Sequence, residues 1–137
     1  MEIKSKLVRV QAPIQEVFDF LKDTRNIYEL LPQDKISDWQ ADELSCSFKV
    51  QGGIIIPFKQ VALEEPEKIH LESGDKAPFP FKLTIFLSDQ GSETEGYLRF
   101  DGQVNMFLKM MIEGPLEHLF NLMAQNLRKR YEQDSSV

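Results

Sequence analysis

An amphipathic helical pattern over residues 104–131 constrains the fold most, because it follows a long stretch, residues 34–105, with the pattern of β-strands. At helical spacing one face of this segment is apolar and the other is polar. The apolar face contains Leu108, Ile112, Leu116, Leu119, Met123, Leu127 and Tyr131, and the opposite face contains Glu113, Glu117, Asn121, Gln125, Arg128 and Glu132. We therefore expect one long helix that packs against a sheet. Gly114-Pro115 predicts a kink or a break that leaves residues 106–113 as a separate first segment at a different angle.

Residues 34–105 alternate apolar and polar side chains, and turn-forming residues interrupt the pattern at 41–43, 51–53, 64–66, 74–78 and 89–92. These five turns divide the region into six strands. The connections are short, which favours an antiparallel meander with one dry and one wet face. Pro57 cannot donate a backbone hydrogen bond, so we expect an edge strand or a bulge there.

The segment before this region predicts one strand and two short helices. Residues 2–11 form the strand, with a bulge near the Leu7-Val8 pair where the alternation fails. Pro13 opens a helix with a regular apolar face made of Ile14, Val17, Phe18 and Leu21. Asp23 or Thr24 caps the second helix, and Pro32 ends it. The fold class is therefore α+β, with about seven strands, in one domain over residues 1–137.

Composition excludes several classes of protein. The chain has 16 basic and 22 acidic residues and a net charge of -6, which argues against a nucleic-acid binder. The single cysteine, Cys46, excludes an internal disulfide and a cysteine-cluster metal site. The first ten residues lack a signal-peptide pattern, and the longest apolar runs, 54–56 and 83–87, are too short to span a bilayer. We expect a cytoplasmic protein without an integral membrane segment.

The order of elements and several local strings resemble a known superfamily. The strings are Ala12-Pro13, Glu16-Val17-Phe18, Phe20-Leu21, Asn26, Leu31-Pro32, Trp39, Cys46-Ser47-Phe48, Gly52, Asn105, Met110-Met111 and Pro115-Leu116. Over nearly its whole length the chain is similar to the START-related SRPBCC superfamily, which includes polyketide cyclase/dehydrase-like and lipid-transfer proteins. The resemblance implies a helix-grip fold, a curved antiparallel sheet around the C-terminal helix with a mostly apolar cavity between them. It implies no catalytic motif, because this fold hosts many activities.

The alternation places a set of apolar side chains on the walls of such a cavity. We predict ligand contacts for Phe48, Val50, Ile69, Leu71, Phe81, Leu83, Ile85, Leu98, Phe100, Met111, Leu119 and Met123. Core packing needs the same residue types, so both interpretations stay open. Gly102 either creates room or permits a bend. We expect Trp39 to be partly buried near the two short helices.

Catalytic chemistry has little support in the sequence. The predicted inward strand positions contain no Asp, Glu, His or Lys, so we name no catalytic residue. His70 and Glu72 alternate with apolar residues, which predicts a solvent-exposed surface pair. His118 stands alone on the helix, and Cys46 has the pattern of a small buried residue, so we expect neither a metal site nor a cofactor.

The leading hypothesis is a non-catalytic carrier or sensor of a small hydrophobic molecule, such as a lipid, isoprenoid or polyketide-like compound. One alternative is an enzyme of cyclase or dehydratase type, which requires a titratable side chain in the cavity. Another is a protein-interaction or chaperone-accessory module, which predicts an exposed apolar patch outside the cavity.

Overall fold

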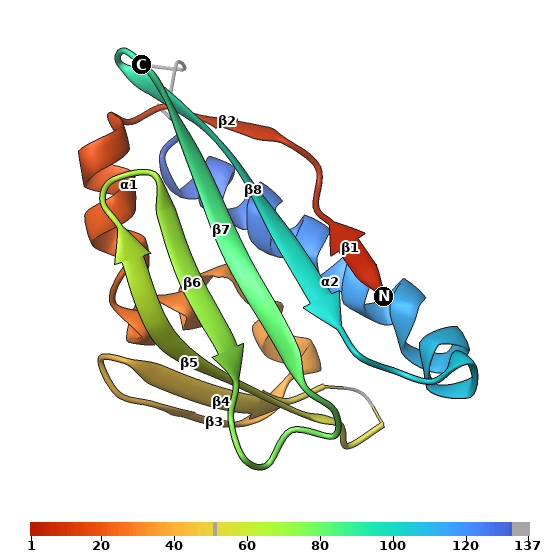
Figure 1. Ribbon diagram of the computed structural model, residues 1–137. Coiled ribbons are helices and arrows are strands. Elements are labelled where there is room, and N and C mark those ends of the chain that lie inside the picture. The colour runs from red at the N-terminus through yellow and green to blue at the C-terminus, as the bar shows by residue number, and fades with distance from the viewer. Residues whose placement is uncertain (51, 133–137) are drawn as a thin grey trace.

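A computed structural model describes residues 1–50 and 52–132, and these ranges form an antiparallel sheet with helices on one side (Figure 1). The strands are β1 Glu2–Lys4, β2 Val8–Val10, β3 Ser37–Ala41, β4 Ser45–Lys49, β5 Ile55–Glu64, β6 Lys68–Ser73, β7 Phe81–Gln90 and β8 Glu93–Gly102. The helices are α1 Ile14–Leu21, η1 Thr24–Leu30, η2 Gln33–Lys35 and α2 Met106–Arg130, where η marks a 3-10 helix. Residue 51, part of the predicted turn 51–53, lies outside the described residues.

The sheet has the order β1-β8-β7-β6-β5-β4-β3, and β2 also pairs with β8. The expected α+β helix-grip architecture is confirmed, with eight strands in the described residues, because the predicted first strand is interrupted. Lys4 pairs with Arg99 and Val8 with Gly96, so residues 5–7 lie opposite only residues 97–98. This extra residue confirms the expected bulge. The Ser5 hydroxyl fills the gap by accepting a hydrogen bond from the Leu98 N–H at 2.9 Å.

Pro57 does not mark a sheet edge, so that prediction is wrong. β5 lies between β4 and β6, and the bulge that it carries is at Val61, between the paired residues Gln60 and Ala62. Pro57 pairs with Ser47 of β4, whereas pairing with β6 begins one residue later at Phe58. The missing N–H of Pro57 therefore removes no bond to β6.

Helix α2 continues through Pro115, so a break at Gly114-Pro115 is excluded, and the alternative of a kink there stays a prediction. Proline removes one internal hydrogen bond, but the first turn is held separately by its cap. Asn105 accepts a hydrogen bond from the Leu108 N–H at 2.8 Å. The predicted apolar face is confirmed, because Ile112, Leu116 and Leu119, followed by Met123 and Leu127, are all buried.

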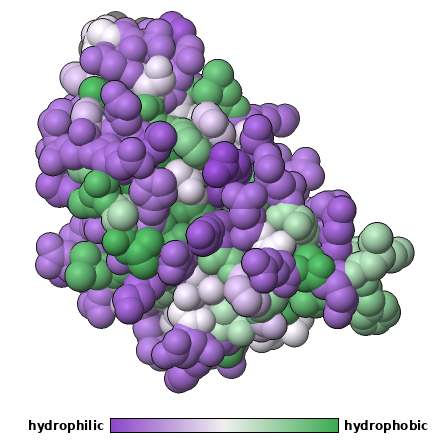
Figure 2. Space-filling view, in the orientation of Figure 1, coloured by the Kyte–Doolittle hydropathy of each residue, from purple (hydrophilic) through white to green (hydrophobic). Residues whose placement is uncertain are grey.

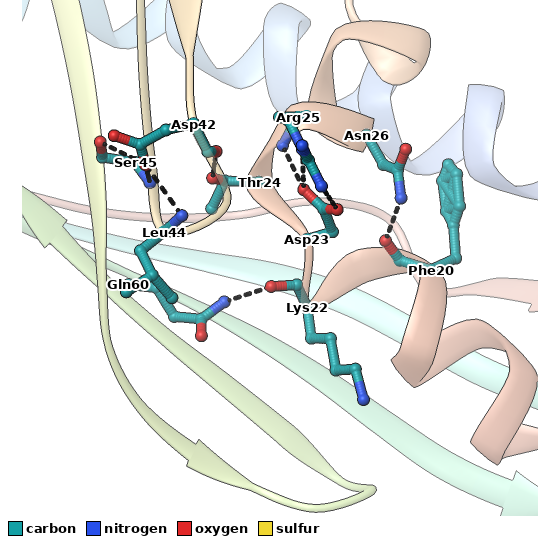
Figure 3. A network of polar contacts seen from close by, with 10 residues as sticks. All are labelled: Phe20, Lys22, Asp23, Thr24, Arg25, Asn26, Asp42, Leu44, Ser45 and Gln60. Carbon is teal, nitrogen blue, oxygen red and sulfur yellow. Dashed lines mark hydrogen bonds and ion pairs between the residues drawn. The ribbon is translucent and has the colours of Figure 1, made fainter.

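A polar network joins the η1 segment to the turn between β3 and β4 (Figure 3). The Thr24 hydroxyl donates to the Asp42 carbonyl at 2.6 Å, and the Asp42 carboxylate accepts bonds from the backbone N–H groups of Leu44 and Ser45, both at 2.9 Å. These bonds lower the pKa of Asp42. The Asn26 amide donates to the Phe20 carbonyl at 2.8 Å and joins η1 to α1. The network holds the β3–β4 hairpin next to the short helices.

Candidate functional site

Aromatic rings fill the space between the middle of the sheet and α2. A row of neighbouring rings crosses the inner face from β3 to the helix, with centroid distances of 5.0 to 6.2 Å, through Trp39, Phe48, Phe58, Phe81, Phe100 and Phe120. Five of the predicted ligand-contact residues are buried in this part of the core: Phe48, Ile69, Leu71, Phe81 and Phe100. Phe58 and Phe120 were not predicted as wall residues. Trp39 is half-buried against Tyr28 of η1, as expected.

Gly102 makes room for another ring of this core. A Cβ atom at Gly102 would lie 2.9 Å from Cε2 of Phe79 and 3.0 Å from Cε1 of Phe100. Both distances are shorter than ordinary carbon–carbon contacts. The space is therefore filled by the protein's own side chains.

Four other predicted residues, Leu83, Ile85, Leu98 and Met123, surround a void at the other end of the helix–sheet interface. The void has a volume of about 20 Å³ and wholly apolar walls. This is the space of about one water-sized probe, and apolar voids of this kind stay dry. The deep interface therefore has no room for an organic ligand in this conformation.

A much larger cleft, of about 840 Å³, opens on one side of α2. Helix α2 packs on β1, β2, β8 and η1, and the cleft lies between the helix and the segment that leads from η2 into β3. Its lining residues are Pro32, Asp34, Lys35, Ile36, Ser37, Lys49, Val50, Gly114, Pro115, Leu116, His118, Leu119 and Leu122. Val50 and Leu119 belong to the predicted set. The volume falls in the range of small-molecule sites.

Local features of the sequence shape the two walls of the cleft: a proline before η2, the pairing of β3 with β4, and a glycine in α2. Pro32 ends η1 and caps η2, where the Lys35 N–H donates to the Pro32 carbonyl at 2.8 Å. Ser37 begins β3 and pairs with Lys49 of β4, so these two residues lie side by side. On the opposite wall, a Cβ atom on Gly114 would have no atom within 4 Å apart from its chain neighbours and the backbone of its own helix turn, so there is open space at that turn of α2. The polar wall was missed because sequence periodicity does not indicate which loop faces the helix.

The charged groups of the cleft lie at its rim and are exposed to solvent. Lys35, Asp34 and His118 are exposed, and the Lys49 ammonium group forms an ion pair with Asp38 at 3.1 Å. No ion pair of Lys35 is found among the described residues. The cleft can therefore place an apolar group against α2 and a polar group near the two lysines.

Cys46 and His70, two titratable residues that the sequence singled out, do not line this cleft. Burial raises the pKa of the Cys46 thiol to about 12, so it stays protonated at neutral pH. The predicted pairing of His70 with Glu72 is wrong, because His70 Nε2 contacts Glu64 Oε2 at 2.5 Å. Glu64 is reached because the bulge at Val61 shifts the β5–β6 register. In residues 1–50 and 52–132 no three His, Cys, Asp or Glu side chains converge on a possible metal position.

The start of α2 presents an exposed apolar surface, which we call the α2 tip, formed by Met106, Phe107, Met110 and Met111. Their side chains are 72%, 74%, 79% and 59% exposed. Figure 2 shows pale green atoms that project at the right of the molecule, where Figure 1 places the beginning of this helix. Met111 was predicted as a cavity wall but lies in this surface. The reason is that α2 extends beyond the sheet at this end.

Comparison with known proteins assigns the chain to a family. Residues 7–134 match the family described as the CoxG subunit of carbon monoxide dehydrogenase. The chain belongs to the CoxG family. No curated protein matches the sequence. No helix among the described residues of this CoxG-family protein is long and apolar enough to cross a membrane.

Solved structures with the same fold have low sequence identity to this CoxG-family chain. A START superfamily protein from Mycobacterium smegmatis is 17% identical, with a TM-score of 0.68, and the match covers 96% of this chain and 97% of that one. Proteins from Chromobacterium violaceum and Thermus thermophilus are 15% and 12% identical, both with a TM-score of 0.73. The match to the Chromobacterium violaceum protein covers 97% of this chain and 98% of that one. The match to the Thermus thermophilus protein covers 96% of this chain and 97% of that one. The expected START-like relationship of the fold is confirmed.

Proposed function

We propose that this CoxG-family protein binds a small hydrophobic molecule in the cleft beside α2, as a carrier or sensor. The observation that supports the proposal is the cleft of about 840 Å³ with Val50, Leu116, Leu119 and Leu122 in its walls. The START-like fold is compatible with this role. The proposed site therefore differs from the one predicted from the sequence. It lies at the side of α2, whereas the sequence predicted a cavity between α2 and the sheet.

Filling the cleft with a side chain tests the proposal. Gly114→Leu adds a large apolar group where there is open space, and it replaces glycine inside a helix by a stronger helix former. The variant should therefore fold at least as well as the parent while its cleft is blocked. Gln125→Leu is the matched control, because Gln125 is an exposed α2 residue that does not line the cleft.

The measurement is displacement of an environment-sensitive fluorescent fatty-acid probe, together with native mass spectrometry of the purified protein. We expect the parent and Gln125→Leu to bind the probe and Gly114→Leu to lose at least tenfold in affinity. Equal binding by all three proteins, or the absence of probe binding and of co-purified lipid in the parent, would reject the cleft as a ligand site.

The α2 tip favours a second candidate, a protein-interaction role. Four large apolar side chains gathered on an exposed helix start are typical of an interaction site. The family is named after a subunit of carbon monoxide dehydrogenase, so that enzyme is the first partner to test. Co-purification of the enzyme with the parent but not with a Phe107→Gln/Met110→Gln variant would support this candidate. Equal recovery with both, or recovery with neither, would count against it.

A further inference from the structure

The two sides of the cleft differ in chemical character. The α2 side presents mainly Pro115, Leu116, Leu119 and Leu122, which offer only apolar side-chain atoms. The opposite side, formed by η2 and the β3–β4 pair, also contains Pro32, Ile36 and Val50, but it adds the polar side chains of Asp34, Lys35, Ser37 and Lys49. A ligand that fits both sides has an apolar body and a polar end.

The charge of the polar side is opposite to that of the protein. The chain as a whole has 22 acidic and 16 basic residues, whereas the cleft lining has two lysines and one carboxylate, Asp34. Both lysines line the same cleft, and both are close to Ser37 along the backbone, since Lys49 pairs with Ser37 and Lys35 precedes it by two residues. The lining thus has one cation more than it has carboxylates, and such a local excess in an acidic protein favours an anionic head group.

Both ammonium groups have donors available for such a head group. An ammonium group carries three N–H donors, and Asp38, at 3.1 Å, is the only ion-pair partner of Lys49 among the described residues. Lys35 has no ion-pair partner among the described residues. His118 reaches the cleft from the α2 side and adds a polar ring to the rim.

We propose that the ligand is an anionic amphiphile, an alkyl chain with a carboxylate head, and that Lys35 and Lys49 bind the head while the chain lies along α2. This inference rests on the proposed function of the cleft. Apolar burial supplies most of the affinity, because it scales with the area removed from water. Charge-assisted hydrogen bonds to the lysines supply the preference for the anion.

The experiment compares three probes of equal chain length, dodecanoate, dodecanol and dodecylammonium, by isothermal titration calorimetry below their micelle concentrations at neutral pH. The parent should bind dodecanoate more tightly than dodecanol, and dodecylammonium most weakly. Lys35→Gln/Lys49→Gln should weaken dodecanoate binding by roughly tenfold, the combined effect of two exposed ion pairs. Its dodecanol affinity should not change.

Lys59→Gln is the control, because Lys59 is an exposed lysine of β5 outside the cleft. Thermal melting of each variant checks that it is folded. The double variant should fold like the parent, because the only ion pair that it loses, between Lys49 and Asp38, is exposed. Equal affinity of the parent for dodecanoate and dodecanol, tighter binding of dodecylammonium, or an unchanged dodecanoate affinity in the double variant would overturn the anion preference and leave the cleft as a site. If no probe bound the parent, the proposed function would fall as well.

Discussion

At the scale of single residues, Cys46 links burial to the pH dependence of stability. Burial raises the pKa of its thiol from 9.0 to about 12, because desolvation disfavours the thiolate. The unfolded chain therefore loses a proton above pH 9 that the folded chain keeps. We expect the free energy of unfolding to include this stabilisation in full below pH 9 and to fall as the pH rises toward 12.

Urea denaturation of the parent and of Cys46→Ala, measured at a series of alkaline pH values, checks this expectation. The alanine variant lacks the titrating group, so the stability of the parent should fall more steeply with pH than that of the variant. Parallel pH profiles for the two proteins would show that the thiol ionises equally in the folded and unfolded chains.

A second prediction at this scale concerns two glycines with opposite surroundings. Gly102→Ala should lower the free energy of unfolding by about 1–3 kcal/mol, because the new Cβ would press on the buried Phe79 and Phe100 rings. Gly114→Ala, in open space inside α2, should raise it by about 0.5–1 kcal/mol. Chemical denaturation measures both values. A stabilising Gly102→Ala would mean that the Phe79 ring moves aside without cost.

Sequence periodicity predicted the inward direction of most candidate site residues but not what they contact. Phe81, Leu83 and Ile85 point inward as the alternation indicates, and all are buried. Alternation describes the faces of one strand, whereas an open cavity depends on how closely the opposite element approaches. That approach is decided by side chains far away in the sequence, such as Phe120 of α2 packed on Phe100. The same limit explains why sequence periodicity did not place Lys35 and Lys49 in one cleft.

At the scale of elements, the uninterrupted α2 helix carries a local cost at Pro115. Proline leaves the carbonyl four residues before it without its helical partner, and its ring crowds that carbonyl. Pro115→Ala restores the bond but also gives the unfolded chain more freedom. We expect the substitution to raise the free energy of unfolding by roughly 1–2 kcal/mol, because the regained bond and relieved crowding exceed the entropic loss.

Circular dichroism and urea denaturation test this prediction. The helical signal should stay the same or rise slightly, since α2 is already helical through residue 115. A large gain in helical signal would instead mean that residues 106–113 are not helical in the parent. Ala124→Pro is the control, because Ala124 is a buried residue in the same helix. This substitution should be strongly destabilising, since the new proline removes a helical hydrogen bond and its ring crowds the preceding turn.

At the scale of the whole molecule, the order of elements was predictable and the place of the cleft was not. Hydrophobic periods and turn residues are local, so they predicted the antiparallel strands and the closing helix. The cleft depends on a long-range arrangement. Helix α2 packs on one end of the sheet order, against β1, β2 and β8, while β3 and β4 form the other end. This asymmetry leaves one side of the helix uncovered.

The same asymmetry predicts how ligand binding changes the dynamics of the molecule. β7 and β8 pair over their full lengths in the interior of the sheet, whereas β3 is an edge strand that pairs only with β4. Amide hydrogens of β3 and η2 should therefore exchange faster than those of β7 and β8 in the free protein. A ligand in the cleft contacts η2, the start of β3 and the middle of α2, and it stabilises the folded form of these segments.

Hydrogen–deuterium exchange with mass spectrometry, with and without dodecanoate, measures this pattern. We expect slower exchange in peptides that cover residues 32–37 and 114–122, and no change in peptides from the middle of β7 and β8. Gly114→Leu, with its blocked cleft, should show no response to dodecanoate at any segment. Protection that is uniform across the sheet would indicate binding in the helix–sheet interface, and protection confined to residues 106–111 would place the ligand on the α2 tip instead.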